Sequence, residues 1–202
     1  MDKVQLLKSL KQEGFSKGII DAFSKVKREN FIPENMKFRT YEDTALPIGE
    51  GQTISQPYTT ATMLSLLSLK KSQRVLEIGS GCGYVLALMS KIVGNKGKIF
   101  GVEIIKSLTD KSKINLQNYK NIIIYNKNGA AGLKEEALFD RIIISAACEE
   151  IPAVLTEQLE EGGIIVAPVG SQYEQTLTSF QKVKGELEIR EEIPGFIFVP
   201  FV

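Results

Sequence analysis

The chain has 202 residues, of which 43% are hydrophobic and 24% charged, with 25 Lys and Arg against 24 Asp and Glu. A net charge of +1 excludes a general attraction to nucleic acid or to anionic membranes, so we expect neither partner. The sequence has no histidine, which excludes Ser-His-Asp and Cys-His catalysis and leaves no metal site expected. Two cysteines, Cys82 and Cys148, are too few for a disulfide framework, and without a signal peptide at Met1 they indicate a cytoplasmic protein.

The N-terminal third is expected to be helical with one irregular segment. Spaced leucines near the N-terminus predict a first helix, and Ser16 is expected to cap a second. Residues 40–56 carry proline and glycine without a helical period, and we expect them to be irregular. A further helix is expected from Pro57 to about Leu69, with Ser55 or Gln56 at its N-cap and proline in its first turn.

From residue 73 the pattern changes to buried strands that alternate with helical segments. This alternation is typical of parallel βαβ units. Strands are expected at residues 74–78, 98–102, 121–125, 139–145 and 163–168, and helices at residues 105–118 and 151–159. An antiparallel pair is expected at residues 175–183 and 186–199. The chain is therefore predicted to be an α/β protein with a mostly parallel sheet.

A glycine loop follows the first strand of this sheet. Residues 76–84 read Leu-Glu-Ile-Gly-Ser-Gly-Cys-Gly-Tyr, so that Glu77 precedes a G-x-G-x-G pattern. A dinucleotide-binding loop needs G-x-G-x-x-G, with a pyrophosphate at the start of the helix. A carboxylate beside the loop repels pyrophosphate and suits S-adenosylmethionine, which carries a sulfonium and an ammonium. The alternative is a structural turn with a solvated Glu77.

Two more polar positions follow neighbouring strands. Glu103 ends the second sheet strand, where a carboxylate can accept hydrogen bonds from both ribose hydroxyls. Asn128-Gly129 follows the third strand, where it can meet an adenine amino group or form an ordinary turn. Residues 145–147 lie at the rim of the fourth strand, either to leave room for a substrate backbone or only to pack. Together these loops favour a cofactor site at the carboxyl ends of the strands.

At this point the sequence resembles a known family. Residues 46–58, Leu-Pro-Ile-Gly-Glu-Gly-Gln-Thr-Ile-Ser-Gln-Pro-Tyr, look like the substrate-loop signature of protein-L-isoaspartate methyltransferases. Further segments fit the same pattern in the same order: residues 28–33, 41–43, 75–84, 139–140, 145–147, 151–152, 162–163, 168–170 and 198–200. The resemblance therefore covers nearly the whole chain. The chain departs from the family at Lys127-Asn128, where Gly-Asp is usual, and at Cys82, where Ser is commoner.

The resemblance implies a fold and an activity. It implies a Rossmann-like class I methyltransferase sheet of seven mostly parallel strands, with helices on both faces and an antiparallel C-terminal pair. The domain would span residues 1–202, with N-terminal helices and the substrate loop in 1–70 and the cofactor-binding sheet in 71–202. The implied reaction is methyl transfer from S-adenosylmethionine to the α-carboxyl of L-isoaspartyl residues in damaged proteins and peptides, a repair step.

The resemblance also implies site residues. Ser55 is carried over as the catalytic residue. The expected cofactor-binding residues are Glu77, Gly79, Ser80, Gly81, Glu103, Asn128 and Gly129, and the expected substrate-loop residues are Asp43, Thr53, Ile54, Gln56 and Tyr58.

The chemistry agrees with a chain that lacks histidine. A carboxylate is already ionised at neutral pH, so its methylation needs alignment and exclusion of water and no general base. Ser55 can orient that carboxylate, or it can serve only as a helix N-cap. Asp43 can fix the loop by accepting backbone N–H groups, or it can be a solvated turn residue. Two other functions stay open: a methyltransferase for another carboxyl group of a peptide, and a cofactor-binding protein that has lost catalysis.

Overall fold

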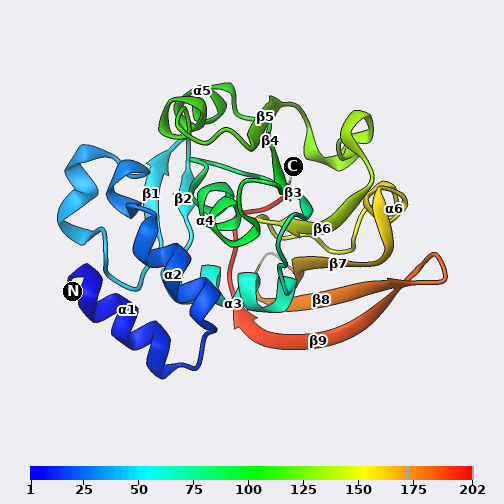
Figure 1. Cartoon of the computed structure of the whole chain (residues 1–202), viewed down its shortest axis with the longest axis horizontal. Coiled ribbons are helices and arrows are strands. Elements are labelled where there is room, and N and C mark those ends of the chain that lie inside the picture. The colour runs from blue at the N-terminus through cyan, green and yellow to red at the C-terminus, as the bar shows by residue number, and fades with distance from the viewer. Residues whose placement is uncertain (172, 202) are drawn as a thin grey trace.

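Seven strands form one sheet in the order β5-β4-β3-β6-β7-β8-β9 (Figure 1). This computed structural model describes residues 1–171 and 173–201. The strands are β3 Arg74–Ile78, β4 Lys98–Glu103, β5 Ile122–Asn126, β6 Phe139–Ile144, β7 Leu159–Gly170, β8 Gln175–Val183 and β9 Glu186–Phe196. Strands β3 to β7 pair in parallel, whereas β8 and β9 are antiparallel to their neighbours. The predicted mostly parallel sheet with an antiparallel C-terminal pair is confirmed.

Helices cover both faces of the sheet. The α-helices are α1 Lys3–Gln12, α2 Lys17–Lys25, α3 Pro57–Leu67, α4 Tyr84–Val93, α5 Lys106–Asn115 and α6 Ala153–Glu157, and the 3-10 helices are η1 Arg28–Asn30, η2 Glu34–Arg39, η3 Gly129–Ala131 and η4 Lys134–Glu136. Alternate residues of each strand point to opposite faces. Val75 on β3 therefore packs into a core shared with α1 to α4, whereas Leu76 packs into a second core shared with α6. Among the described residues, no helix has the length and apolarity needed to cross a membrane.

Part of the segment expected to be irregular is a small hairpin. Strand β1 Leu46–Gly49 pairs antiparallel with β2 Gln52–Ile54. Its turn carries three consecutive positive φ angles, 101° at Gly49, 54° at Glu50 and 69° at Gly51, and glycine adopts such angles without steric cost. The prediction of irregular backbone is wrong for residues 46–54, because strands of three or four residues are too short to show an alternating pattern.

Several element ends also differ from the prediction. Helix α6 covers only Ala153–Glu157, since Leu159 already pairs with Phe139 as the first residue of β7. Helix α5 ends at Asn115 and not at residue 118. Strand β9 ends at Phe196 and not at residue 199. Helix and strand ends depend on tertiary pairing that local patterns do not contain.

After β9 the chain turns back across the carboxyl ends of the strands, so that the C-terminus lies near the end of β3 (Figure 1). The N–H of Ala147 donates to the carbonyl of Val199 at 2.8 Å, and the N–H of Phe201 donates to the carbonyl of Ala147 at 2.8 Å. The strand order reverses at β3, which neighbours β4 on one side and β6 on the other. Ligands of open α/β sheets bind outside the carboxyl ends of strands at such a point, and the C-terminal segment lies over it.

Candidate active site

The glycine loop after β3 is held against the neighbouring strand. The N–H groups of Gly79 and Ser80 both donate to the carbonyl of Val102, at 2.9 and 3.1 Å. Gly79, Gly81 and Gly83 have φ angles of 75°, 49° and 85°, which favour glycine. At Gly83 a Cβ atom would lie 2.6 Å from the Leu116 side chain, so a larger residue does not fit. The loop thus exposes backbone to a ligand and still packs tightly against α5.

Glu103 ends β4, and two backbone N–H groups fix the position of its carboxylate. Its Oε2 accepts the N–H of Gly81 at 2.8 Å, and its Oε1 accepts the N–H of Ile105 at 2.9 Å. The side chain is nearly buried but lines a cavity together with Gly79 and Gly81. A carboxylate oxygen has two acceptor sites, so each oxygen can accept one further hydrogen bond. This arrangement suits a pair of ribose hydroxyls, and the ribose role of Glu103 stays a prediction.

Glu77 lies beneath the glycine loop and not on the cavity wall. Its Oε1 accepts the hydroxyl of Ser145 at 2.7 Å, while its Oε2 is buried without a partner, as is the hydroxyl of Ser80. Burial raises the pKa of Glu77 to about 8; the hydrogen bond from Ser145 lowers it and the nearby Glu103 raises it. A positive charge in the cavity would favour the ionised form of Glu77. Direct cofactor contacts by Glu77 and Ser80 stay predictions.

The cavity above the loop, about 610 Å³ with the open solvent at its mouth included, draws its walls from the ends of β3, β4, β5 and β6. Glu103, Ser145 and Gly129 follow or end β4, β6 and β5 and all line it. Asn128 is exposed and turns its Oδ1 to the N–H of Ala130 at 2.8 Å, so it does not line this cavity. In the described part of the chain, no lysine or arginine lines the cavity, which therefore offers no cation to a phosphate.

A second cavity, about 1160 Å³ with the open solvent at its mouth included, adjoins the first. Ser55, Gln56 and Tyr58 line it on one side, and the end of β9 with the C-terminal segment, residues 193–199, lines it on the other. Thr53, Ser145 and Val199 line both cavities. These three residues therefore mark the junction of the two cavities. Of the predicted substrate-loop residues, Asp43 and Ile54 do not line this cavity, and the Ile54 side chain is buried in the core.

Ser55 is not the cap of α3. The N-cap position is occupied by Gln56, whose side chain makes no capping bond. The cap comes instead from Asp43, whose Oδ1 accepts the N–H of Tyr58 at 2.8 Å and whose Oδ2 accepts the Gln56 side-chain amide at 3.1 Å. The hydroxyl of Ser55 is thus not needed for the helix start, and Ser55 is a half-buried residue that lines the second cavity.

Two contributors to the site were not anticipated from the sequence. The C-terminal residues Val199, Pro200 and Phe201 cover the first cavity, and Arg28 is buried behind Ser55. Residues 198–200 resemble the family pattern, but their side chains indicate no binding chemistry, and only the fold-back across the strand ends brings them to the site. Arg28 stands within a segment that resembles the family pattern, but nothing in its local sequence indicates a buried arginine.

The fold and the site define an S-adenosylmethionine-dependent methyltransferase of class I. A solved S-adenosylmethionine-dependent O-methyltransferase from Thermotoga maritima shares the fold, with a TM-score of 0.54 at 16% identity over 74% of this chain and 64% of that one. The particular family follows from closer matches. The sequence model of protein-L-isoaspartate(D-aspartate) O-methyltransferase (PCMT) matches residues 1–202, and the chain belongs to this family.

Individual relatives agree with this assignment. Proteins named protein-L-isoaspartate O-methyltransferase from Methanococcoides burtonii and Methanothrix thermoacetophila are 39% and 42% identical, over 98% and 100% of this chain and 98% and 95% of their own. A solved protein-L-isoaspartate O-methyltransferase matches 98% of this chain with a TM-score of 0.90 at 30% identity, and the chain spans 65% of that longer protein. A Plasmodium falciparum structure described as a PCMT in complex with S-adenosyl-L-homocysteine gives a TM-score of 0.85 at 28% identity, over 98% of this chain and 97% of that one.

Proposed function

We propose that the protein transfers a methyl group from S-adenosylmethionine to the α-carboxyl of L-isoaspartyl residues in proteins and peptides. The observation that carries this proposal is the pair of adjoining cavities, which share Thr53, Ser145 and Val199. One cavity has the chemistry of a cofactor site, and the other presents Ser55. Methyl transfer needs donor and acceptor in contact and shielded from water, which two joined cavities provide.

The residues of the first cavity fit the cofactor. S-adenosylmethionine supplies an electrophilic methyl group on a positively charged sulfur. Glu103 offers free acceptor sites for ribose hydroxyls, and the unpaired Oε2 of Glu77 beneath the loop offers compensating charge. Gly79 and Gly81 bring the backbone close to the ligand because they carry no side chain. We assign these four residues, with Gly129, to cofactor binding.

The second cavity fits an isoaspartyl carboxylate. We assign Ser55 as the catalytic residue that donates its hydroxyl to one carboxylate oxygen and so aims the other toward the first cavity. A neutral hydroxyl orients the nucleophilic carboxylate and leaves its negative charge intact. A lysine or arginine in this place would neutralise that charge and weaken the nucleophile. Gln56, Tyr58 and Thr53 line the same cavity and are assigned to substrate binding, whereas Asp43 acts through the backbone that it holds.

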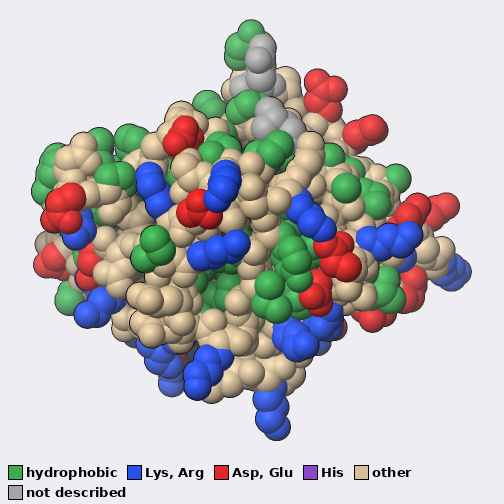
Figure 2. Space-filling view, turned by 90° about the horizontal axis from the view of Figure 1, so that it is seen from above, with side chains coloured by type: hydrophobic (Ala, Val, Ile, Leu, Met, Phe, Trp, Pro, Cys, Tyr) green, Lys and Arg blue, Asp and Glu red, His purple; other side chains and the backbone are tan. Residues whose placement is uncertain are grey.

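The remaining assignments follow from charge and organisation. On the face shown in Figure 2, basic and acidic side chains are interspersed and neither sign covers the surface continuously. Together with the net charge of +1, this supports protein and peptide substrates and not nucleic acid. We also propose a cytoplasmic location and a single domain in which residues 1–70 supply the substrate side and residues 71–202 the cofactor side.

Turnover on two peptides that differ only in an isoaspartyl or a normal aspartyl residue tests the proposal, with Ser55→Ala and the exposed Ser65→Ala as matched variants. We expect methylation of the isoaspartyl peptide alone, at a strongly lowered rate with Ser55→Ala and at the wild-type rate with Ser65→Ala. Methylation of both peptides would indicate a carboxyl methyltransferase of another specificity. Binding of S-adenosyl-L-homocysteine with no turnover on either peptide would indicate a cofactor-binding protein without catalysis.

A further inference from the structure

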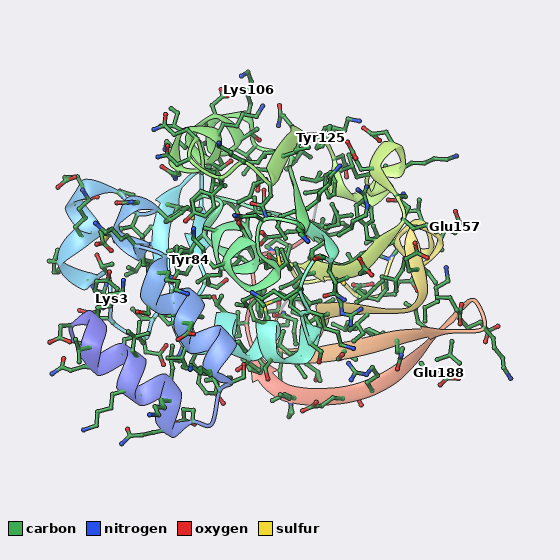
Figure 3. The ribbon with its side chains drawn as sticks, viewed as in Figure 1. Lys3, Tyr84, Lys106, Tyr125, Glu157 and Glu188 are labelled. Carbon is green, nitrogen blue, oxygen red and sulfur yellow. The ribbon has the colours of Figure 1, made fainter. Side chains whose placement is uncertain are left out.

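Arg28 is a fully buried arginine that is bonded to backbone and not to a carboxylate. Its Nε donates to the carbonyl of Thr40 at 3.0 Å, and its Nη2 donates to the carbonyls of Ser55 at 3.0 Å and Thr44 at 3.5 Å. Its Cζ lies 5.0 Å from the centre of the Tyr84 ring, and Tyr84 lies between α2 and the body of α4 (Figure 3). None of the ion pairs within residues 1–171 and 173–201 involves Arg28.

A guanidinium in this position is costly for the fold. Its Nη1 is buried without a hydrogen-bond partner, and burial lowers the pKa of Arg28 despite the opposing effects of Tyr84 and Cys82. The carboxylate of Asp43 also raises the pKa of Arg28, but it accepts no hydrogen bond from the guanidinium. All three hydrogen bonds of Arg28 go to backbone carbonyls around Ser55, so its contacts indicate a role in holding these segments.

The carbonyl held by Arg28 belongs to the residue assigned to catalysis. Ser55 and Gln56 lie between β2 and α3, outside both elements. Arg28 holds the backbone on the Ser55 side of this link, and Asp43 holds it on the Gln56 and Tyr58 side. With the carbonyl of Ser55 pinned toward the interior, the peptide plane that follows it cannot rotate, and the Cα–Cβ bond of Ser55 keeps its direction into the second cavity.

We propose that Arg28 is a positioning residue for methyl transfer, which orients Ser55 through its backbone carbonyl; this inference rests on the proposed function of Ser55. Arg28 does not line either cavity, so it acts without touching substrate or cofactor. The bond to Ser55 and the bond to Thr40, next to the Asp43 segment, come from one rigid planar group. A lysine has one nitrogen and cannot hold both carbonyls with the same geometry.

The test uses Arg28→Met, which keeps the buried stem without donors, and Arg28→Lys. The matched control is Arg141→Met: Arg141 is also buried, donates to the carbonyl of Leu67 at 2.8 Å at the opposite end of α3, and is absent from both cavities. We expect Arg28→Met to lower kcat on an isoaspartyl peptide at least tenfold, with the Kd for S-adenosyl-L-homocysteine within twofold of wild type. Arg28→Lys should retain an intermediate kcat, and Arg141→Met should retain the wild-type value.

A double-mutant cycle separates positioning from a general loss of structure. In a Ser55→Ala background, Arg28→Met should lower kcat by less than threefold, since this background lacks the Ser55 hydroxyl that Arg28 orients. Multiplicative effects of the two substitutions, or a kcat of Arg28→Met within twofold of wild type, would overturn the proposal. Failure of both Arg28 variants to fold, while Arg141→Met folds, would also overturn it, because the role of Arg28 would then be structural.

Hydrogen exchange gives a readout that does not depend on activity. Arg28→Met should speed amide exchange in residues 55–60 relative to both wild type and Arg141→Met. If the wild type lacks isoaspartyl turnover but this exchange result holds, then the proposed function fails while the orienting contact stands. Unchanged exchange in residues 55–60 of an active protein would reject the positioning role and leave the proposed function intact.

Discussion

At the scale of single residues, the role of Ser55 is open to a direct test. Because Asp43 and not Ser55 caps α3, Ser55→Ala should leave the melting temperature nearly unchanged. The hydrogen bond to the carboxylate weakens as negative charge leaves it, so the loss arises from alignment. We expect the single-turnover rate to fall by the equivalent of about 2 kcal/mol, the lower end for one positioned donor. Wild-type rates in a folded Ser55→Ala protein would contradict the catalytic assignment.

Glu77 makes stability depend on pH. Its pKa is raised to about 8 in the folded protein, chiefly by burial, whereas the unfolded value is near the ordinary 4.5. Between these values the unfolded chain releases a proton that the folded chain retains, so rising pH favours unfolding through this group. Glu77→Gln removes this effect and keeps an oxygen for the hydroxyl of Ser145. The stability of the variant relative to wild type should therefore increase from pH 5 to pH 8, by roughly 3–5 kcal/mol for the full shift.

Urea unfolding at pH 5 and pH 8 measures this difference, with the exposed Glu150→Gln as a control. If the difference in unfolding free energy between Glu77→Gln and wild type is the same at both pH values, then the carboxyl of Glu77 is already ionised in the folded protein across this range.

A site residue can be predicted from the sequence when its role follows from the local pattern, and it cannot when its role depends on a contact between distant segments. Glu103 could be placed because it ends a recognisable strand, and the backbone contact of Asp43 could be anticipated from its loop. Asn128 turns its side chain to its own 3-10 helix, and its contact with the cofactor stays a prediction. The role of Arg28 depends on a bond across 27 positions of the chain, and such a contact is set by the tertiary fold.

At the scale of elements, helix α3 depends on a cap from a distant loop. Asp43→Ala removes the acceptor of the Tyr58 N–H and should destabilise the protein by about 1 kcal/mol, as loss of an N-cap does. Asp43→Asn should restore most of this loss, because an amide oxygen also accepts. The control is Asp110→Ala, since Asp110 makes only an exposed ion pair with Lys106. Equal melting temperatures for Asp43→Ala and Asp110→Ala would mean that the cap does not contribute to stability.

The elements themselves were predicted where they are long and periodic. All seven strands of the main sheet and the helices α1, α2, α3, α5 and α6 lie within a few residues of expectation. The β1–β2 hairpin was not predicted, because its short strands and its turn are defined by pairing partners and not by a repeated pattern.

At the scale of the whole molecule, the cavity predicts which ligands stabilise the protein. Excess S-adenosyl-L-homocysteine should raise the melting temperature, since a ligand that binds only the folded state stabilises it. NAD should not, because no lysine or arginine lines the described cavity to meet its phosphates. In calorimetry, heat from NAD together with no heat from S-adenosyl-L-homocysteine would overturn the assignment of the cavity as an S-adenosylmethionine site.

Calorimetry should also show that Glu103→Ala weakens cofactor binding by about 1–3 kcal/mol, the cost of losing hydrogen bonds to a charged group.

The central claim is that the two cavities bring a methyl donor to an isoaspartyl carboxylate. The most direct measurement is mass spectrometry of an isoaspartyl peptide and its aspartyl counterpart after incubation with the protein and S-adenosylmethionine. The account predicts that only the isoaspartyl peptide gains the mass of one methyl ester, located by fragmentation at its α-carboxyl. A methyl group on the aspartyl peptide, on another side chain, or on neither peptide would contradict it.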